Sequence, residues 1–183
     1  MFIYAYIKER KEGDTAAKLR LISLYACAFY YAASISFGLT YNRLFLVYVA
    51  LFACSLFGMF KQICNLKLTG TVSTTKGLTV FLILSGIALI VAWLPDVIPS
   101  FINGGTLSLI GVYTTNITYI LDMGIISPIC FVTLYLLKKE NALGTLLLAI
   151  LLKACMVVGI MMFPQTICQV LSGCEIPIPT LVT

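Results

Sequence analysis

Two ionisable side chains lie deep inside long apolar runs, where a charge is costly and usually serves a function. Asp122 is the only charged residue in the run 119–137, and Lys153 is the only one in the run 142–163. A carboxylate can bind cations or exchange protons, whereas an ammonium group can bind anions. Asp122 and Lys153 are therefore the first candidates for ligand-binding residues.

The residues around Asp122 add hydroxyl groups and a predicted break in the helix. Thr115 and Thr118 precede Asp122 at helical spacing, so the three side chains share one face. Pro128 has no N–H to donate to the carbonyl of Gly124, which predicts a kink there. Interrupted helices often line binding sites in membrane bundles. The alternative is a carboxylate that caps or snorkels at the outer interface.

Lys153 lies near the middle of its run and shares a face with Thr145 and Ala149. Small and polar residues are typical of a face that packs against another helix or lines a cavity. We hypothesise that Asp122, Lys153 and the Pro128 kink line one polar cavity between the fourth and fifth spans, open to the outside. The alternative is a structural lysine paired with Asp122 or with a backbone carbonyl.

Three further residues, predicted to lie in the outer half of the bundle, complete the candidate ligand-binding set: Tyr30, Asn42 and Asp96. Tyr30 also has the simpler interpretation of a packing residue on a small-residue helix face. The external loop 96–116 could cover an outward cavity together with Trp93. We favour the interpretation of Trp93 as an anchor in the aromatic belt of the membrane interface.

The sequence offers no catalytic constellation. It contains no histidine, which excludes histidine triads, histidine zinc sites and histidine-ligated haem. None of its seven cysteines forms a CxxC pair, so a dithiol redox site has no support. We therefore predict no catalytic residue, no metal and no cofactor. Whether Cys168 and Cys174 form a disulfide is left open.

The composition shows which elements must position these side chains. The 183 residues are 61% hydrophobic and 10% charged, whereas soluble domains carry about 25% charged residues. A membrane-spanning helix needs about 20 apolar residues. The apolar runs predict an all-α, polytopic transmembrane bundle of five spans. The predicted spans end near Thr40, Phe60, Leu94, Leu137 and Phe163.

The basic residues predict the orientation of these spans. Ten lysines and arginines fall in the N-terminal tail and in the loops after the second and fourth spans, whereas only Arg43 falls on the opposite side. The positive-inside rule then predicts a cytoplasmic N-terminus and an external C-terminus. We expect a basic tail over 1–20, the bundle over 21–163 and an external tail over 164–183. The net charge of +5 thus reflects topology, with the lipid bilayer as partner and no nucleic acid.

Four clusters of landmarks resemble a family of uncharacterised bacterial multi-pass integral membrane proteins with no assigned activity. The clusters are Tyr30 with Gly38 and the segment 41–50, Trp93–Asp96 with Pro99 and Gly104, Tyr119–Gly124 with Pro128, and Lys138-Lys139 with Gly144. The resemblance covers roughly residues 17–163. It implies a multi-pass protein of the bacterial plasma membrane. It also implies one more helix before the first span, of which the apolar stub 1–7 would be the end.

The most favoured function is a module that binds or transports an unknown small molecule at a polar site in the outer half of the bundle. The alternative is a structural or partner subunit of a larger membrane complex, such as a transporter component or a homo-oligomer. A membrane enzyme is the least favoured class, because no catalytic constellation is present.

Overall fold

The computed structural model describes residues 7, 15–39, 42–68, 70–103 and 117–171. Its helices are α2 (Thr15–Gly38), α3 (Phe45–Cys64), α4 (Lys76–Asn103), α5 (Ile117–Leu121), the π-helical turn η1 (Asp122–Ile126), α6 (Ser127–Lys138) and α7 (Ala142–Leu171). Because α5, η1 and α6 follow one another without a break, they form a single span. Five helical segments are thus long and apolar enough to cross a membrane, which confirms the predicted all-α fold class.

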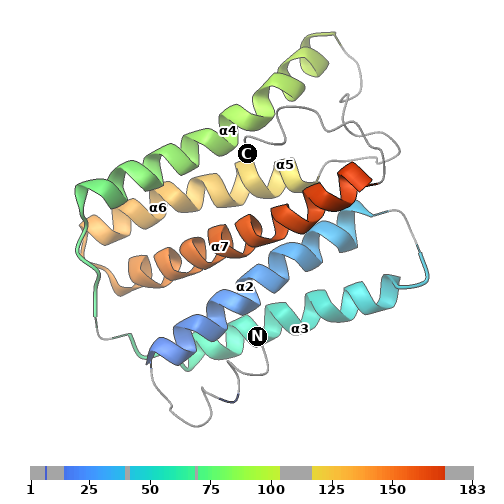
Figure 1. Cartoon of the computed structure of the whole chain (residues 1–183). Coiled ribbons are helices and arrows are strands. Elements are labelled where there is room, and N and C mark those ends of the chain that lie inside the picture. The colour runs from blue at the N-terminus through green and yellow to red at the C-terminus, as the bar shows by residue number, and fades with distance from the viewer. Residues whose placement is uncertain (1–6, 8–14, 40–41, 69, 104–116, 172–183) are drawn as a thin grey trace.

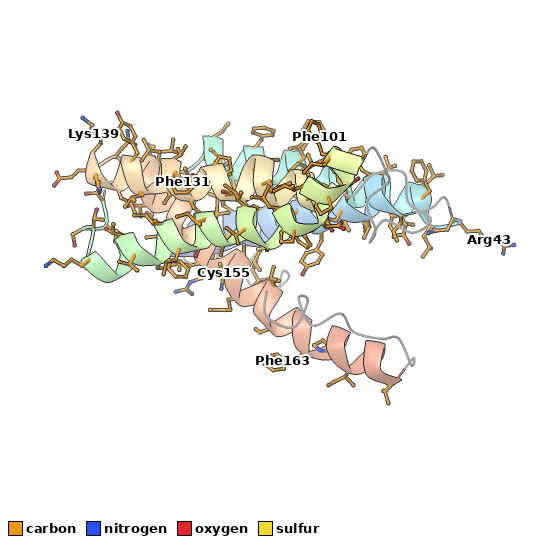
Figure 2. All side chains as sticks on the ribbon, turned by 90° about the horizontal axis from the view of Figure 1, so that it is seen from above. Arg43, Phe101, Phe131, Lys139, Cys155 and Phe163 are labelled. Carbon is orange, nitrogen blue, oxygen red and sulfur yellow. The ribbon has the colours of Figure 1, made fainter. Side chains whose placement is uncertain are left out.

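The five spans lie side by side in the order α4, α6, α7, α2 and α3 (Figure 1). Successive helices run in opposite directions, so α2, α4 and α7 all begin at the same end of the bundle. We call this the basic end, because Lys76, Lys138 and Lys139 lie there. Arg43 lies at the opposite end (Figure 2). This arrangement agrees with the charge asymmetry from which the orientation was predicted.

Close packing between the spans depends on small residues. The backbone of α3 approaches α2 at Gly58, where an added Cβ would lie 2.6 Å from the ring of Tyr25. Gly86 of α4 approaches α6 in the same way, with the ring of Phe131 2.8 Å from an added Cβ. The Ser127 hydroxyl also donates a 2.7 Å hydrogen bond to the Gly86 carbonyl. Small residues that allow such approaches are typical of helix pairs in membranes.

Towards the basic end, α4, α6 and α7 enclose an apolar core. Its buried members are Leu82, Cys130, Leu134, Leu137, Leu148 and Leu151. The outer surface of the bundle is instead rich in exposed large side chains, such as Leu46 at 77% and Phe101 at 88%. Exposed apolar side chains of this kind suit contact with lipid rather than water. The structure therefore supports a multi-pass membrane protein.

Two helices run farther than the sequence predicted. α4 continues beyond Leu94 through Pro95 and Pro99 to Asn103, and α7 continues beyond Phe163 into the predicted tail, to Leu171. The predicted ends followed the limits of the apolar runs, whereas Pro95, Pro99 and Pro164 lie inside the observed helices. Spans tolerate such residues because neighbouring groups and local adjustments satisfy the backbone.

α2 also begins earlier than predicted, at Thr15, within the segment assigned to the basic tail. The helix is therefore extended by residues that include Lys18 and Arg20.

The second half of α7 leaves the row of helices. In the view from above, α7 diverges from the other spans between Cys155 and Phe163 (Figure 2). Two of the described side chains there are strongly exposed, Ile160 at 64% and Phe163 at 75%. Near the opposite end of the bundle α2 therefore contacts α5 directly, although α7 separates α2 from α6 nearer the basic end. This direct contact brings together the residues of the candidate site.

Candidate functional site

The π-helical turn η1 positions Asp122. The backbone N–H of Ser127 donates to the carbonyl of Asp122, five residues earlier instead of four. Pro128 follows directly as the second residue of α6 and has no N–H to continue the regular pattern. The kink predicted at Gly124 and Pro128 thus takes the form of a π-turn. Such turns are rare and frequently occur at functional sites.

The carboxylate of Asp122 joins three spans. Only 8% of the residue is exposed. Its Oδ1 accepts a hydrogen bond of 2.6 Å from the Tyr30 hydroxyl of α2, and its Oδ2 accepts one of 3.1 Å from the Trp93 indole N–H of α4. Both carboxylate oxygens therefore have a donor, as a buried carboxylate requires.

A second carboxylate lies beside the first. The Tyr119 hydroxyl donates a 2.9 Å hydrogen bond to Oδ2 of Asp96 on α4. The rings of Trp93 and Tyr119 stack on one another, with centroids 4.3 Å apart and planes 28° apart. Each helix thus offers one aromatic donor and one aspartate, and each aromatic side chain donates to the aspartate of the other helix.

The reciprocal arrangement follows from the sequence of the two helices. Trp93 and Asp96 are three residues apart, as are Tyr119 and Asp122, so each pair lies on one face of its helix. Because the two faces meet, the aromatic residue of each can reach the carboxylate of the other. We call Tyr30, Trp93, Asp96, Tyr119 and Asp122 the aromatic–carboxylate cluster.

The cluster lies in the half of the bundle that contains Arg43, away from the basic end. Asp122 is five residues from the start of α5 at Ile117, or about 7.5 Å along the helix axis. The five side chains include two carboxyl groups and no cationic group. Burial is deepest at Tyr119 and Asp122, at 4% and 8% exposed. The site is therefore an acidic, aromatic centre inside an apolar span.

The predicted ligand-binding residues separate into two groups in the structure. Tyr30, Asp96 and Asp122 are brought together in the cluster. Thr118 is half-buried on α5, next to Tyr119, and Thr115 lies outside the described residues. Asn42 is exposed before α3, where its side-chain oxygen accepts a 2.8 Å hydrogen bond from the Leu44 N–H. That local bond gives Asn42 a role in the connection between α2 and α3.

Lys153 is not part of the cluster. It lines a groove with Arg20 and Ser23 of α2, whereas Asp122 is bonded to Tyr30 of the same helix. Tyr30 lies seven residues beyond Ser23, or about 10 Å farther along the axis. This geometry does not support the hypothesis of one cavity shared by Asp122 and Lys153, which stays a prediction. Each charged residue faces α2, but the two do so at different depths.

Sequence reasoning missed two members of the cluster. Trp93 was interpreted as an interface anchor, whereas in the structure its indole N–H donates a hydrogen bond to Asp122. Tyr119 was not selected at all. The signal that could have found both is a repeated pattern, an aromatic residue followed three positions later by aspartate, which occurs as Trp93–Asp96 and as Tyr119–Asp122.

Among the residues that the structure describes, no group of three or more cysteine or acidic side chains could hold a metal ion. The described free cysteines are Cys27, Cys54, Cys64, Cys130 and Cys155. Cys174 and the side chain of Cys168 fall outside the described part, so the disulfide between them stays an open question.

The chain matches no protein-family model, no curated protein and no solved structure. The resemblance to bacterial multi-pass proteins thus stays a prediction.

Proposed function

We propose that this protein is a multi-pass module of the bacterial plasma membrane that binds or transports a small molecule at the aromatic–carboxylate cluster. The observation that carries the proposal is Asp122, a carboxylate more than nine-tenths buried in an apolar span and held by donors from two other helices. An acidic residue at such a position is costly and is a functional candidate by default. Its location at a π-turn supports the same interpretation.

The chemistry of the cluster favours a cationic ligand. Asp96 and Asp122 supply negative charge, and the stacked rings of Trp93 and Tyr119 supply electron-rich aromatic faces. Carboxylates and aromatic faces are the groups that attract ammonium ions in proteins. Most of the described basic residues gather at the other end of the bundle, and Arg43 is the exception on the side of the cluster. A small organic amine is therefore the ligand class that we propose for this site.

The second candidate function is a structural subunit of a membrane complex. One specific observation favours it: Tyr30 and Trp93 already donate to both oxygens of Asp122. A ligand would have to displace one of these donors or bind through Asp96. In the structural interpretation the cluster only fastens α2 and α4 to η1.

Trp93 provides a direct test, because it is the only tryptophan in the chain and belongs to the cluster. The full chain in lipid nanodiscs would be titrated with methylamine, putrescine and tetramethylammonium while tryptophan emission is measured. Acetate and glycerol serve as anionic and neutral probes. We expect a saturable change of emission with at least one amine and none with acetate or glycerol.

Variants then separate the two candidate functions. Asp122→Asn should abolish the response to the amine, whereas Glu140→Gln, an exposed residue between α6 and α7, should leave it unchanged. A protein that folds but shows no saturable response to any amine would contradict binding and support the structural subunit. A response to acetate would contradict the proposed charge of the ligand.

A further inference from the structure

An open groove of about 240 Å³ lies between α2 and α7, away from the aromatic–carboxylate cluster. It is lined by Leu19, Arg20, Ser23, Ala149, Leu152, Lys153 and Met156. Arg20 and Lys153 come from different helices and converge on the same space. Among the residues that the structure describes, no carboxylate lines the groove, and the two positive charges share it. Such an arrangement calls for an anion.

The depth of the groove indicates where that anion is found. Arg20 lies five residues from the start of α2, and Lys153 lies eleven from the start of α7, or about 7.5 and 16.5 Å along the two axes. Both helices start at the basic end (Figure 1). Helical side chains lean towards the N-terminus of their helix, so Lys153 extends towards Arg20 and the basic surface. Arg20 therefore lies nearer the headgroups on that side, and Lys153 lies deeper, with its side chain directed towards them.

The remaining lining suits a lipid rather than a soluble anion. Leu19, Leu152 and Met156 present apolar side chains to the groove beside the two cations. A phosphate would meet the cations, and the hydrocarbon of the same molecule could lie along the apolar residues. Basic pockets between spans on the cytoplasmic side are known to bind acidic headgroups, and the basic end is the one predicted to be cytoplasmic.

We propose that the groove between α2 and α7 binds the phosphate headgroup of an anionic glycerophospholipid through Arg20 and Lys153. The lipid supplies the counter-charge that makes Lys153 tolerable in an apolar span. This site is separate from the proposed amine site, because it lies about two helical turns nearer the basic end on α2. The two proposals can therefore be tested independently, and a negative result for one does not bear on the other.

The test is native mass spectrometry of the full chain in detergent with equimolar phosphatidylglycerol and phosphatidylcholine. The measured quantity is the ratio of the two bound lipids. We expect the wild-type protein to prefer phosphatidylglycerol. Lys153→Met and Arg20→Gln should each lower that preference roughly fivefold, the contribution of one basic residue near an acidic lipid. Lys138→Met, a change at the exposed end of α6, is the matched control and should leave the preference unchanged.

The source of the phosphate is tested by competition. Inorganic phosphate and glycerol 3-phosphate should not displace bound phosphatidylglycerol, because they lack the hydrocarbon. Displacement by either would overturn the lipid proposal in favour of a soluble anion. Equal lipid preference in the wild type, Lys153→Met and Arg20→Gln would overturn the site altogether. Because Arg20 is exposed, its variant keeps the test valid even if Lys153→Met does not fold.

Discussion

Replacing Asp122 with asparagine tests the part of the structure on which the proposed function depends. The carboxylate accepts from Tyr30 at 2.6 Å and from Trp93 at 3.1 Å. Asparagine has one acceptor oxygen and one donor NH₂ group. Its oxygen can still accept from the Trp93 N–H, and its NH₂ group can donate to the Tyr30 oxygen, because a hydroxyl also accepts. The Tyr30 O–H then loses its acceptor, and neither remaining bond involves a charged group.

The size of this effect follows from the bonds that are lost. A hydrogen bond to a charged group contributes about 1.5–3 kcal/mol in soluble proteins, whereas polar contacts between spans contribute roughly 0.6–1.7 kcal/mol. We therefore expect Asp122→Asn to lower the free energy of unfolding by about 2 kcal/mol. Tyr30→Phe removes one donor and leaves the Trp93 bond in place, so it should cost about 1 kcal/mol.

The assay is reversible unfolding in mixed micelles, followed through the emission of Trp93, the single tryptophan. The emission of the folded Asp122→Asn protein should also shift, because the indole environment changes. Tyr30→Phe should cost less in the Asp122→Asn background than in the wild type, since the shared bond is already lost. The reasoning is refuted if the free energy of unfolding of Asp122→Asn lies within about 0.5 kcal/mol of the wild-type value and its tryptophan emission is unchanged.

Three further predictions concern packing and topology. Ser127→Ala should destabilise by roughly 1 kcal/mol, because it removes the buried hydrogen bond from α6 to the Gly86 carbonyl of α4. Thr133→Val should be neutral or stabilising, because among the described residues its buried hydroxyl has no partner. Thermal melts in detergent that rank the two variants in the reverse order would contradict this. Gly144→Ala should destabilise more than Gly159→Ala in the same melts, because a Cβ at Gly144 lies 2.8 Å from the backbone of α6 and one at Gly159 meets nothing within 4 Å; equal melting temperatures would count against it. A reporter enzyme that works only outside the cytoplasm should be active when fused to the C-terminus, and activity of an N-terminal fusion instead would reverse the orientation.

The number and class of the spans could be predicted because they depend on local composition. Runs of about 20 apolar residues must form helices in a membrane, since each backbone group needs an internal partner. The helix ends were harder to predict, because Pro99 and Pro164 lie inside helices that continue past them. A single sequence does not say which proline is accommodated by its surroundings.

The partners of Asp122 could not be predicted, because they depend on which helices are neighbours. Lys153 was considered as a partner because it is the other charged residue deep in a span, and the two spans follow one another in the chain. In the structure α7 leaves the row beyond Cys155 (Figure 2), so α2 reaches η1 instead and supplies Tyr30. Helical spacing places residues on a common face, but it does not indicate what that face meets.

The π-turn also fixes the rotational phase between the two halves of its span. It holds one residue more than a regular α-helical turn, so deleting one residue within Asp122–Ile126 should restore regular helix. Gly124 is the residue to delete, since even an added Cβ there would meet nothing within 4 Å. Because the extra residue is taken up within that single turn, the deletion would leave Asp122 and Tyr119 near their present angle relative to α6. Both carboxylate bonds to α4 would then be kept, and only the widened turn would be lost. In the evolution of such a span, a single codon gained or lost at this turn would change the local helix geometry without erasing the site.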